Sequence, residues 1–160
     1  MADTEIYQNY FDRYTTLVKE TNVADALKNQ DAALEDFFSK ISEEKSNYAY
    51  AAGKWTLKEM LQHMIDTERI FTYRALAVAR GEKINLPGFD ENEYAGNADA
   101  GRRSWASLTE EMKVVRKSTK LLYASFSDAM LELEGKANNN PCKVSTIGFI
   151  IPGHVTHHLR

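Results

Sequence analysis

The longest regular pattern in this chain of 160 residues is an amphipathic segment between Thr56 and Arg80. Thr56 followed by Glu59 has the form of a capping box, in which each side chain bonds the other residue's backbone N–H, and this predicts the start of a helix. Gly81 supplies a stop at the other end. The pattern therefore predicts a helix of about 24 residues, built around one apolar stripe. The stripe comprises Leu57, Met60, Leu61, Met64, Phe71, Ala75 and Val78.

Three further segments have apolar residues at helical spacing. The first runs from Val23 to Ile41, after an aromatic-rich stretch, 7–18, that we expect to be a shorter helix or an irregular arm on the core. Another runs from Arg103 to Phe126, and a short turn of helix is expected to follow it. The last is predicted to begin near Ser145, a good N-cap residue, with a bend or local irregularity at Pro152, just before the histidines.

The connections between these segments indicate the fold class. Only three prolines and eight glycines occur, and glycine-bearing stretches separate long helix-like segments, so the sequence predicts an all-α protein. Four long helices with connections long enough to cross over predict a four-helix bundle, as one domain over residues 1–160. The polar connection 81–101 is longer than a normal bundle loop, and such loops are often functional or act as lids. Asn138-Asn139-Asn140-Pro141 predicts a break in the chain.

Composition excludes several classes of protein. The formal charge of −3 gives no electrostatic footprint for nucleic acid, so no nucleic-acid partner is expected. No run approaches the roughly 20 apolar residues of a membrane span, and Asp3 and Glu5 interrupt any signal peptide. The single cysteine, Cys142, cannot form an intramolecular disulfide, which suits a reducing compartment. We therefore expect a cytoplasmic protein without a membrane partner.

The four histidines point to a metal site. His154 and His158 are four residues apart, so on a helix they lie one turn apart on one face, where both can bind one cation. They continue an apolar stripe, and His157 points about 100° away from His158 as a bystander. His63 is the only other histidine and lies at the edge of the stripe on the 56–80 helix. Three imidazoles leave an open coordination position, as catalytic sites do.

Other interpretations of the histidines have to be weighed. Pairs of histidines at i,i+4 also arise by chance, and the macrodipole favours histidine at a helix end. Against this, the pair extends a buried face, where imidazoles need partners. The zinc-protease helix is excluded because Val155 stands where that motif has its glutamate. A di-iron carboxylate bundle is disfavoured because Glu59 and His63 are four residues apart instead of three.

At this point the residues resemble a known family. The segments WTLKEMLQHMIDTER (55–69), LPGFDEN (86–92) and GHVTHHL (153–159), with Tyr73-Arg74, are similar to the DinB/YfiT-like superfamily over nearly the whole chain. The resemblance implies a bundle with a distinctive crossover connection. It also implies one divalent metal ion, with Zn²⁺ or Ni²⁺ favoured, on one histidine of the second helix and a His-x-x-x-His pair of the last. These are His63, His154 and His158.

The resemblance also suggests an activity. Family members include thiol-dependent transferases that use bacillithiol, mycothiol or glutathione, and a metal promotes such reactions by lowering the pKa of a bound thiol. The main expectation is a thiol-dependent S-transferase acting on small electrophiles, with a low-molecular-weight thiol as co-substrate. The alternatives are a metal-dependent hydrolase or a non-catalytic bundle that binds metal or a small molecule. A homodimer is left open. The family name concerns expression after DNA damage and is no sign of DNA binding.

Two charged residues of the 56–80 helix are candidates for a role at the site. Glu68 falls near the middle of the apolar arc, where an unpaired carboxylate is costly, so it needs a partner. We expect either a role beside the metal or in acid–base catalysis, or a structural ion pair. Arg74 lies about three turns beyond His63 and could contact an anionic group of a substrate or cofactor, with a salt bridge as the alternative.

Three residues outside the helices carry weaker expectations. Cys142 precedes the last helix and is read as a plain loop thiol, because no basic motif lies near it. Tyr48 and Tyr50 stand just before the 56–80 helix and are expected to pack against the pocket or to line it.

Overall fold

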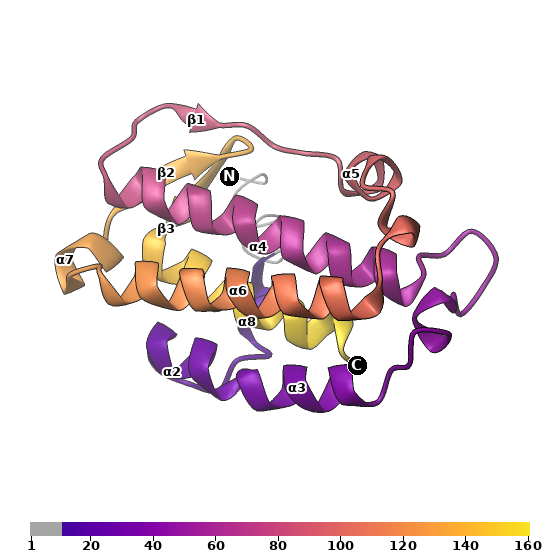
Figure 1. Cartoon of the computed structure of the whole chain (residues 1–160). Helices are drawn as coiled ribbons and strands as arrows, with labels where there is room; N and C mark the ends of the chain where they lie inside the picture. The colour runs from indigo at the N-terminus through magenta and orange to yellow at the C-terminus, as the bar shows by residue number, and fades with distance from the viewer. Residues whose placement is uncertain (1–10) are drawn as a thin grey trace.

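The computed structural model describes residues 11–160 as a bundle of helices with a small sheet along one side (Figure 1). Helix α4 (Leu57–Ala79), helix α6 (Trp105–Ala124) and helix α8 (Val144–His158) form three sides of the bundle. The pair α2 (Val23–Asn29) and α3 (Asp31–Ser39) forms the fourth. Asp3 and Glu5, on which the expectation about a signal peptide rests, lie outside the described residues. Over the described part of the chain, no helix is both long and apolar enough to cross a membrane.

Helix α4 begins and ends where the sequence predicts. The Thr56 side chain accepts the N–H of Glu59, and the Glu59 carboxylate accepts the N–H of Thr56, so the capping box is complete. Arg80 caps the other end, and Gly81 follows with a φ of 88°, a backbone conformation that glycine adopts without strain. Helix α6 is also confirmed, with Ser104 as its N-cap. The expected short helix follows it as α7 (Asp128–Leu131).

The predicted helix over 23–41 is wrong in one respect, because it is two helices that meet at Gln30. The Gln30 side chain is buried, donates to Thr156 Oγ1 at 2.8 Å and accepts from Arg116 Nη1 at 2.8 Å. On either side of this junction, Leu27 packs in one hydrophobic cluster and Leu34 packs in another. The long-range hydrogen bonds of Gln30 lie at this junction, so tertiary contacts override the continuous local pattern.

The start of α8 also differs from the prediction. Strand β3 (Asn140–Lys143) runs straight into the helix, so Lys143 occupies the N-cap position without a side-chain cap and Ser145 lies inside the helix. The Val144 N–H, which begins the helix, donates to the Leu133 carbonyl at 3.1 Å instead. The helix then continues through Pro152 to His158 without interruption.

A three-stranded sheet is the element that the sequence does not predict. Strand β2 (Glu134–Ala137) pairs antiparallel with β3, and β1 (Asn85–Leu86) pairs parallel with β2. The turn between β2 and β3 is made by Asn138 and Asn139, whose φ angles are 51° and 63°. Two consecutive residues with positive φ fit the tight turn of a hairpin, so the asparagine run that predicts a break is a hairpin turn.

The connection 81–101 is structured over most of its length. It contributes β1, helix α5 (Glu91–Asn97) and the 3₁₀ turn η2 (Ala100–Arg102). Another 3₁₀ turn, η1 (Lys45–Asn47), lies elsewhere in the chain, before α4. The Asp90 carboxylate caps α5 by accepting the N–H groups of Asn92 and Glu93 at 2.8 and 3.0 Å. At the other end of the described chain, residues 11–15 are helical, and Tyr14 is buried in the core. The rest of the predicted N-terminal arm, 7–10, lies outside the described residues.

Candidate metal centre

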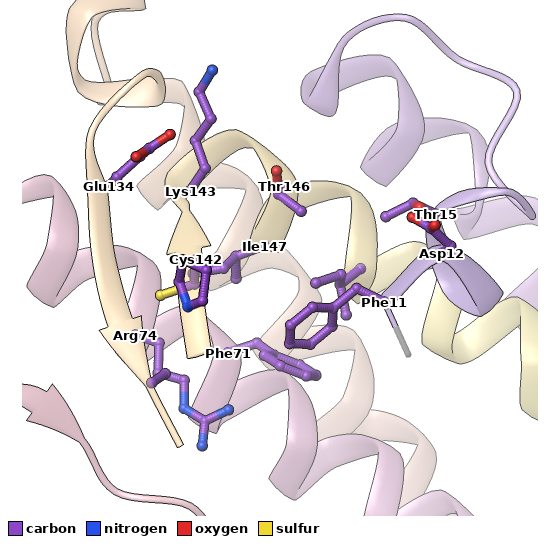
Figure 2. A pocket seen from close by; sticks show the side chains of 13 residues that line it. Phe11, Asp12, Thr15, Phe71, Arg74, Glu134, Cys142, Lys143, Thr146 and Ile147 are labelled. Carbon is purple, nitrogen blue, oxygen red and sulfur yellow. The ribbon is translucent and has the colours of Figure 1, made fainter. Parts of the chain in front are cut away.

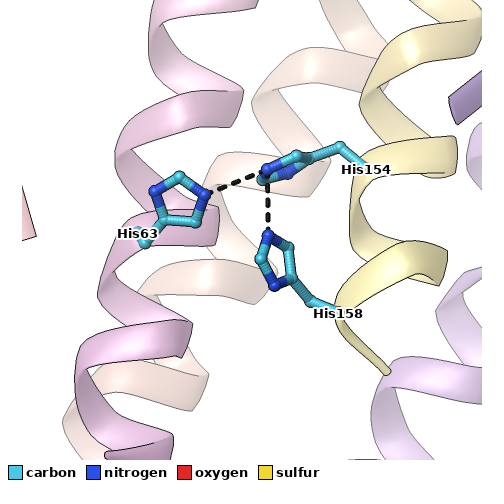
Figure 3. Close-up of side chains that lie close together, drawn as sticks. All are labelled: His63, His154 and His158. Carbon is cyan, nitrogen blue, oxygen red and sulfur yellow. Dashed lines mark hydrogen bonds between the residues drawn. The ribbon is translucent and has the colours of Figure 1, made fainter. Parts of the chain in front are cut away.

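Three histidines from two helices come together in the interior. His63 projects from α4, and His154 and His158 project one turn apart from α8 (Figure 3). The Nε2 atom of His154 lies 3.0 Å from Nε2 of His63 and 3.1 Å from Nε2 of His158. One ring nitrogen from each residue lies within 4.8 Å of the other two. The three side chains that the sequence nominates are thus brought to one point.

Burial keeps these imidazoles neutral. It lowers the pKa of His63 and of His158 to about 4, because a charged ring would lose its hydration. The pKa of His154 is lowered well below the usual value, by burial first and then by the nearby His158, His63, His157 and Arg13. Ligands at about 2.0–2.1 Å from one ion stand roughly 3.0–3.4 Å from each other, depending on coordination geometry. Neutral nitrogens at the observed separations are therefore a donor set that could hold a divalent metal ion.

The surroundings fix the orientation of the rings. The Trp55 ring lies 4.8 Å from the His63 ring, and Thr67 Oγ1 makes a long contact of 3.5 Å with His63 Nδ1. The edge of Tyr14 packs on His154 with 5.3 Å between ring centroids. A proton on Nδ1 of His63, with Thr67 accepting it, would leave Nε2 as a lone-pair donor, which is how neighbouring groups commonly set the tautomer of a ligand histidine.

Two cavities open onto the histidines. The first, which we call the polar cavity, has a volume of about 380 Å³ and is lined by His63, His154 and Arg74, among others. The second, which we call the aromatic cleft, has a volume of about 410 Å³ and is lined by His158, Trp55 and Met60, among others. Both volumes fall within the range of small-molecule sites. The histidines thus stand at a place that a small molecule can reach from two directions.

Comparison with known proteins places this architecture in a family. The sequence model of the DinB superfamily matches residues 26–160. The chain belongs to the DinB superfamily. Its structure resembles that of YfiT from Bacillus subtilis, described as a probable metal-dependent hydrolase with an unusual four-helix bundle topology. The TM-score is 0.72 at 12% identity, over 93% of this chain and 81% of that chain. At this identity the likeness shows the shared fold. No curated protein sequence matches the chain.

The bystander histidine of this DinB bundle lies where the helical geometry puts it. His157 is exposed and turned from the cluster, with its ring 5.6 Å from the Tyr14 ring. It is not among the three residues whose nitrogens converge. In the run 154–158, His154 and His158 thus converge with His63 and His157 does not, as the helical spacing predicts, while their role as metal ligands stays a prediction.

Glu68 has the partner that its position demands. Its two carboxylate oxygens accept from Arg116 Nε and Nη2, each at 2.9 Å, and Thr119 Oγ1 donates to one of them at 2.8 Å. Arg116 also donates to the Gln30 side chain, which in turn donates to α8 at Thr156. The ion pair therefore links α4, α6 and α8 through the α2–α3 junction. A role of Glu68 in acid–base catalysis stays a prediction.

Arg74 reaches the polar cavity. Its side chain is buried, its Nη2 donates to the Pro87 carbonyl at 2.8 Å, and its guanidinium lies 5.7 and 6.0 Å from the rings of Phe71 and Phe89. It lines the same cavity as His63. Contact with an anionic group stays a prediction, but the structure places the cation where such a contact could be made.

Cys142 belongs to a different cavity. It lies on β3 instead of in a loop, and its thiol lines a space of about 250 Å³ with Arg74, Phe71 and Phe11 (Figure 2). Burial raises the pKa of this thiol, which makes it a weaker nucleophile at neutral pH. None of the three converging histidines lines this cavity.

Sequence reasoning missed part of each cavity wall. Tyr48 and Tyr50 line the aromatic cleft, one of the two roles expected for them, and both are largely exposed. Asn138 and Asn140 line the polar cavity from the hairpin turn, and Asn92 of α5 lines both cavities. The Asn-rich run was a usable signal for the turn, but its position beside the histidines depends on how the sheet packs on α4.

Proposed function

We propose that this protein is a metal-dependent hydrolase of a small molecule, with one divalent ion held by His63, His154 and His158. The observation that carries the proposal is the convergence of three neutral Nε2 atoms where two cavities meet. YfiT, which shares the fold, is described as a probable metal-dependent hydrolase, and this supports hydrolysis over the alternatives.

The chemistry follows from the donor set. A divalent ion on three imidazoles supplies Lewis-acid activation of water or of a carbonyl or phosphoryl oxygen. The protein's own contribution is to hold the rings neutral by burial, so that protons do not compete for Nε2 above about pH 4 at His63 and His158. Zn²⁺ and Ni²⁺ are the favoured ions, but imidazole also suits copper and iron, so availability decides the occupant.

The first test measures metal content and turnover together. We expect one divalent ion per chain, and loss of that ion in His63→Ala, His154→Ala and His158→Ala. His157→Ala is the matched control, because His157 lies on the same helix turn and is exposed. A panel of esters, amides, lactones and phosphoesters should show hydrolysis that a chelator abolishes and added Zn²⁺ or Ni²⁺ restores. Full metal content in all three variants would refute the ligand assignment.

A thiol-dependent S-transferase is the second candidate. Two cavities that meet at the histidines could receive a thiol on one side and an electrophile on the other, and Asn92 lies on the wall of both. Chlorodinitrobenzene or an epoxide, offered with glutathione or cysteine and the metal, tests this reaction. Metal-dependent turnover that requires the thiol favours the transferase, whereas turnover with water alone favours the hydrolase. Stoichiometric metal without either reaction favours a non-catalytic binding bundle.

A further inference from the structure

The two cavities follow helix α4 one after the other. Leu57 and Met60 line the aromatic cleft, and His63, one turn after Met60, lines the polar cavity. Thr67, Phe71 and Arg74 continue the wall of the polar cavity along later turns of the same helix. At 1.5 Å per residue, the distance from Leu57 to Arg74 is about 25 Å along the axis. The histidines therefore lie between the two cavities along α4.

The α8 ligands are divided in the same way. His158 lines the aromatic cleft and His154 lines the polar cavity, while Asn92 lines both. A molecule that lies along α4 would therefore pass the Nε2 atoms near its middle. Such a molecule has one end in each cavity.

The aromatic cleft has an apolar wall. Trp55, Leu57 and Met60 are half-buried, and Tyr48 and Tyr50 stand at its open side with 60% and 72% of their surface exposed. Lys54, the one charged side chain lining this cleft among the described residues, is exposed. Aromatic and thioether side chains of this kind bind alkyl or aryl groups through apolar contact.

The polar cavity differs from the aromatic cleft because a buried charged side chain, that of Arg74, lines it. Arg74 is 7% exposed, whereas Asp90 and Glu91, which also line this cavity, are exposed at its edge. The Asp90 carboxylate is already engaged by the N–H groups of α5. Charge is felt most strongly where water is excluded, so the guanidinium has more influence on a bound group than the two solvated carboxylates. A guanidinium presents several N–H donors in a plane, a geometry that matches a carboxylate.

We infer that the substrate is an elongated amphiphile, with an apolar group in the aromatic cleft, the bond to be cleaved at the histidines and a carboxylate toward Arg74. This inference rests on the proposed function, which supplies the metal and the reaction. It adds the class of substrate and the direction in which the substrate lies. A compact substrate, or two separate reactants of the kind that a transferase needs, would not require both ends at once.

Three hydroxamates test the two ends separately, because a hydroxamate binds the metal and anchors each probe. Acetohydroxamate carries the anchor alone, octanohydroxamate adds an alkyl chain, and suberic monohydroxamate has the same chain length with a terminal carboxylate. Titration calorimetry on the Zn²⁺-loaded protein gives the three dissociation constants. We expect the alkyl chain to tighten binding about tenfold over acetohydroxamate, from burial of apolar surface. Suberic monohydroxamate, whose chain should run into the polar cavity instead, should also bind about tenfold tighter than acetohydroxamate, as expected of a charge-assisted hydrogen bond to Arg74.

Substitutions in one cavity should remove the gain in affinity from one probe and leave the gain from the other probe unchanged. Tyr48→Ser with Tyr50→Ser should abolish the gain from the alkyl chain and spare that from the carboxylate, and Arg74→Gln should do the reverse. Tyr73→Ser and Arg80→Gln are matched controls, because both side chains are exposed on α4 or at its end, outside the two cavities. Because Arg74 is buried and its variant could misfold, adipic and sebacic monohydroxamates are also compared in the unsubstituted protein. The gain from the carboxylate should depend on chain length.

The outcomes separate this inference from the proposed function. If acetohydroxamate binds the metal-loaded protein but either gain is missing, or if a gain survives its own substitution, the amphiphile inference is overturned and the metal centre stands. If no metal binds, the proposed function fails. The metal-free protein is then titrated with octanohydroxamate and suberic monohydroxamate while amide chemical shifts are followed. Chemical-shift changes in residues 48–57 with octanohydroxamate, and around Arg74 with suberic monohydroxamate, would support the two proposed binding regions. Changes in neither segment would overturn the amphiphile inference.

Discussion

At the scale of single residues, the histidines make stability depend on pH. Burial holds the pKa of His63 and His158 at about 4, below the 6.5 of a free imidazole. Between these two values the unfolded chain binds protons that the folded chain does not, so the free energy of unfolding falls as the pH falls. The slope is at most about 1.4 kcal/mol per pH unit for each ring. Above about pH 6.5 the rings are neutral in both states and stability is unaffected by them.

We therefore expect metal-free protein to lose stability from about pH 6.5 down to about pH 4. Urea unfolding at a series of pH values measures this loss. His158→Gln should flatten the slope relative to the unsubstituted protein, while His157→Gln, at an exposed position, should not. Parallel curves for the unsubstituted protein and His158→Gln would contradict the assignment of the slope to the buried rings.

A second single-residue effect concerns Gly153, directly before His154. A Cβ at Gly153 would lie 2.2 Å from the Tyr14 carbonyl oxygen, so the N-terminal segment or α8 would have to move. We expect Gly153→Ala to destabilise the fold by about 1–3 kcal/mol and to weaken metal binding, because overpacking shifts the backbone that carries His154. Gly96→Ala is the control, since nothing lies within 4 Å of the added atom. Thermal melting and metal titration report the two effects. A Gly153→Ala protein that keeps both properties would show that this close approach is dispensable.

At the scale of the elements, the Glu68–Arg116 pair sets how the helices are held together. Both side chains are about 2% exposed, and the pair connects α4 and α6. Removing one partner leaves a buried charge, so Arg116→Met alone should cost about 3–5 kcal/mol, whereas Glu68→Leu with Arg116→Met should cost much less. Urea unfolding of the three proteins measures these differences.

The same variants decide the predicted catalytic role of Glu68. If Glu68 is a structural partner, the double variant should retain metal and metal-dependent turnover despite having no carboxylate at this position. If Glu68 acts in acid–base chemistry, kcat should fall by a factor of 10²–10⁴ in the double variant while metal content persists. The pH profile of the residual activity should then lose one limb.

The boundaries of some helices can be predicted from neighbouring residues alone, whereas others depend on contacts that are distant in sequence. The capping box at Thr56 and Glu59 and the stop at Gly81 are signals within one or two turns, and they fix α4 to within a residue. Ser145 failed as a helix start because Leu133, distant in sequence, provides the acceptor for the first N–H of α8. Gln30 divides the first helix for a similar reason, since its bonds to Thr156 and Arg116 are long-range.

At the scale of the whole molecule, the candidate metal centre depends on α4 and α8 lying side by side (Figure 1). This packing brings His63 to His154 and His158, which come from the other end of the chain. It also lets α5 and the hairpin turn complete the cavity walls with Asn92 and Asn138. The connection 81–101, which its length alone marks as unusual, thus lies over the site.

The sequence by itself determined the long helices and nominated the three histidines as candidate ligands. His154 and His158 share a face because helical spacing is local, and His63 was the only imidazole left to join them. Only the tertiary structure decided that their Nε2 atoms meet, that Glu68 is satisfied by Arg116, and that an apolar cleft and a polar cavity adjoin the histidines. The physical reason is that periodicity and capping are encoded within a few residues, whereas cavities and buried ion pairs arise from packing between segments with no local signal for each other.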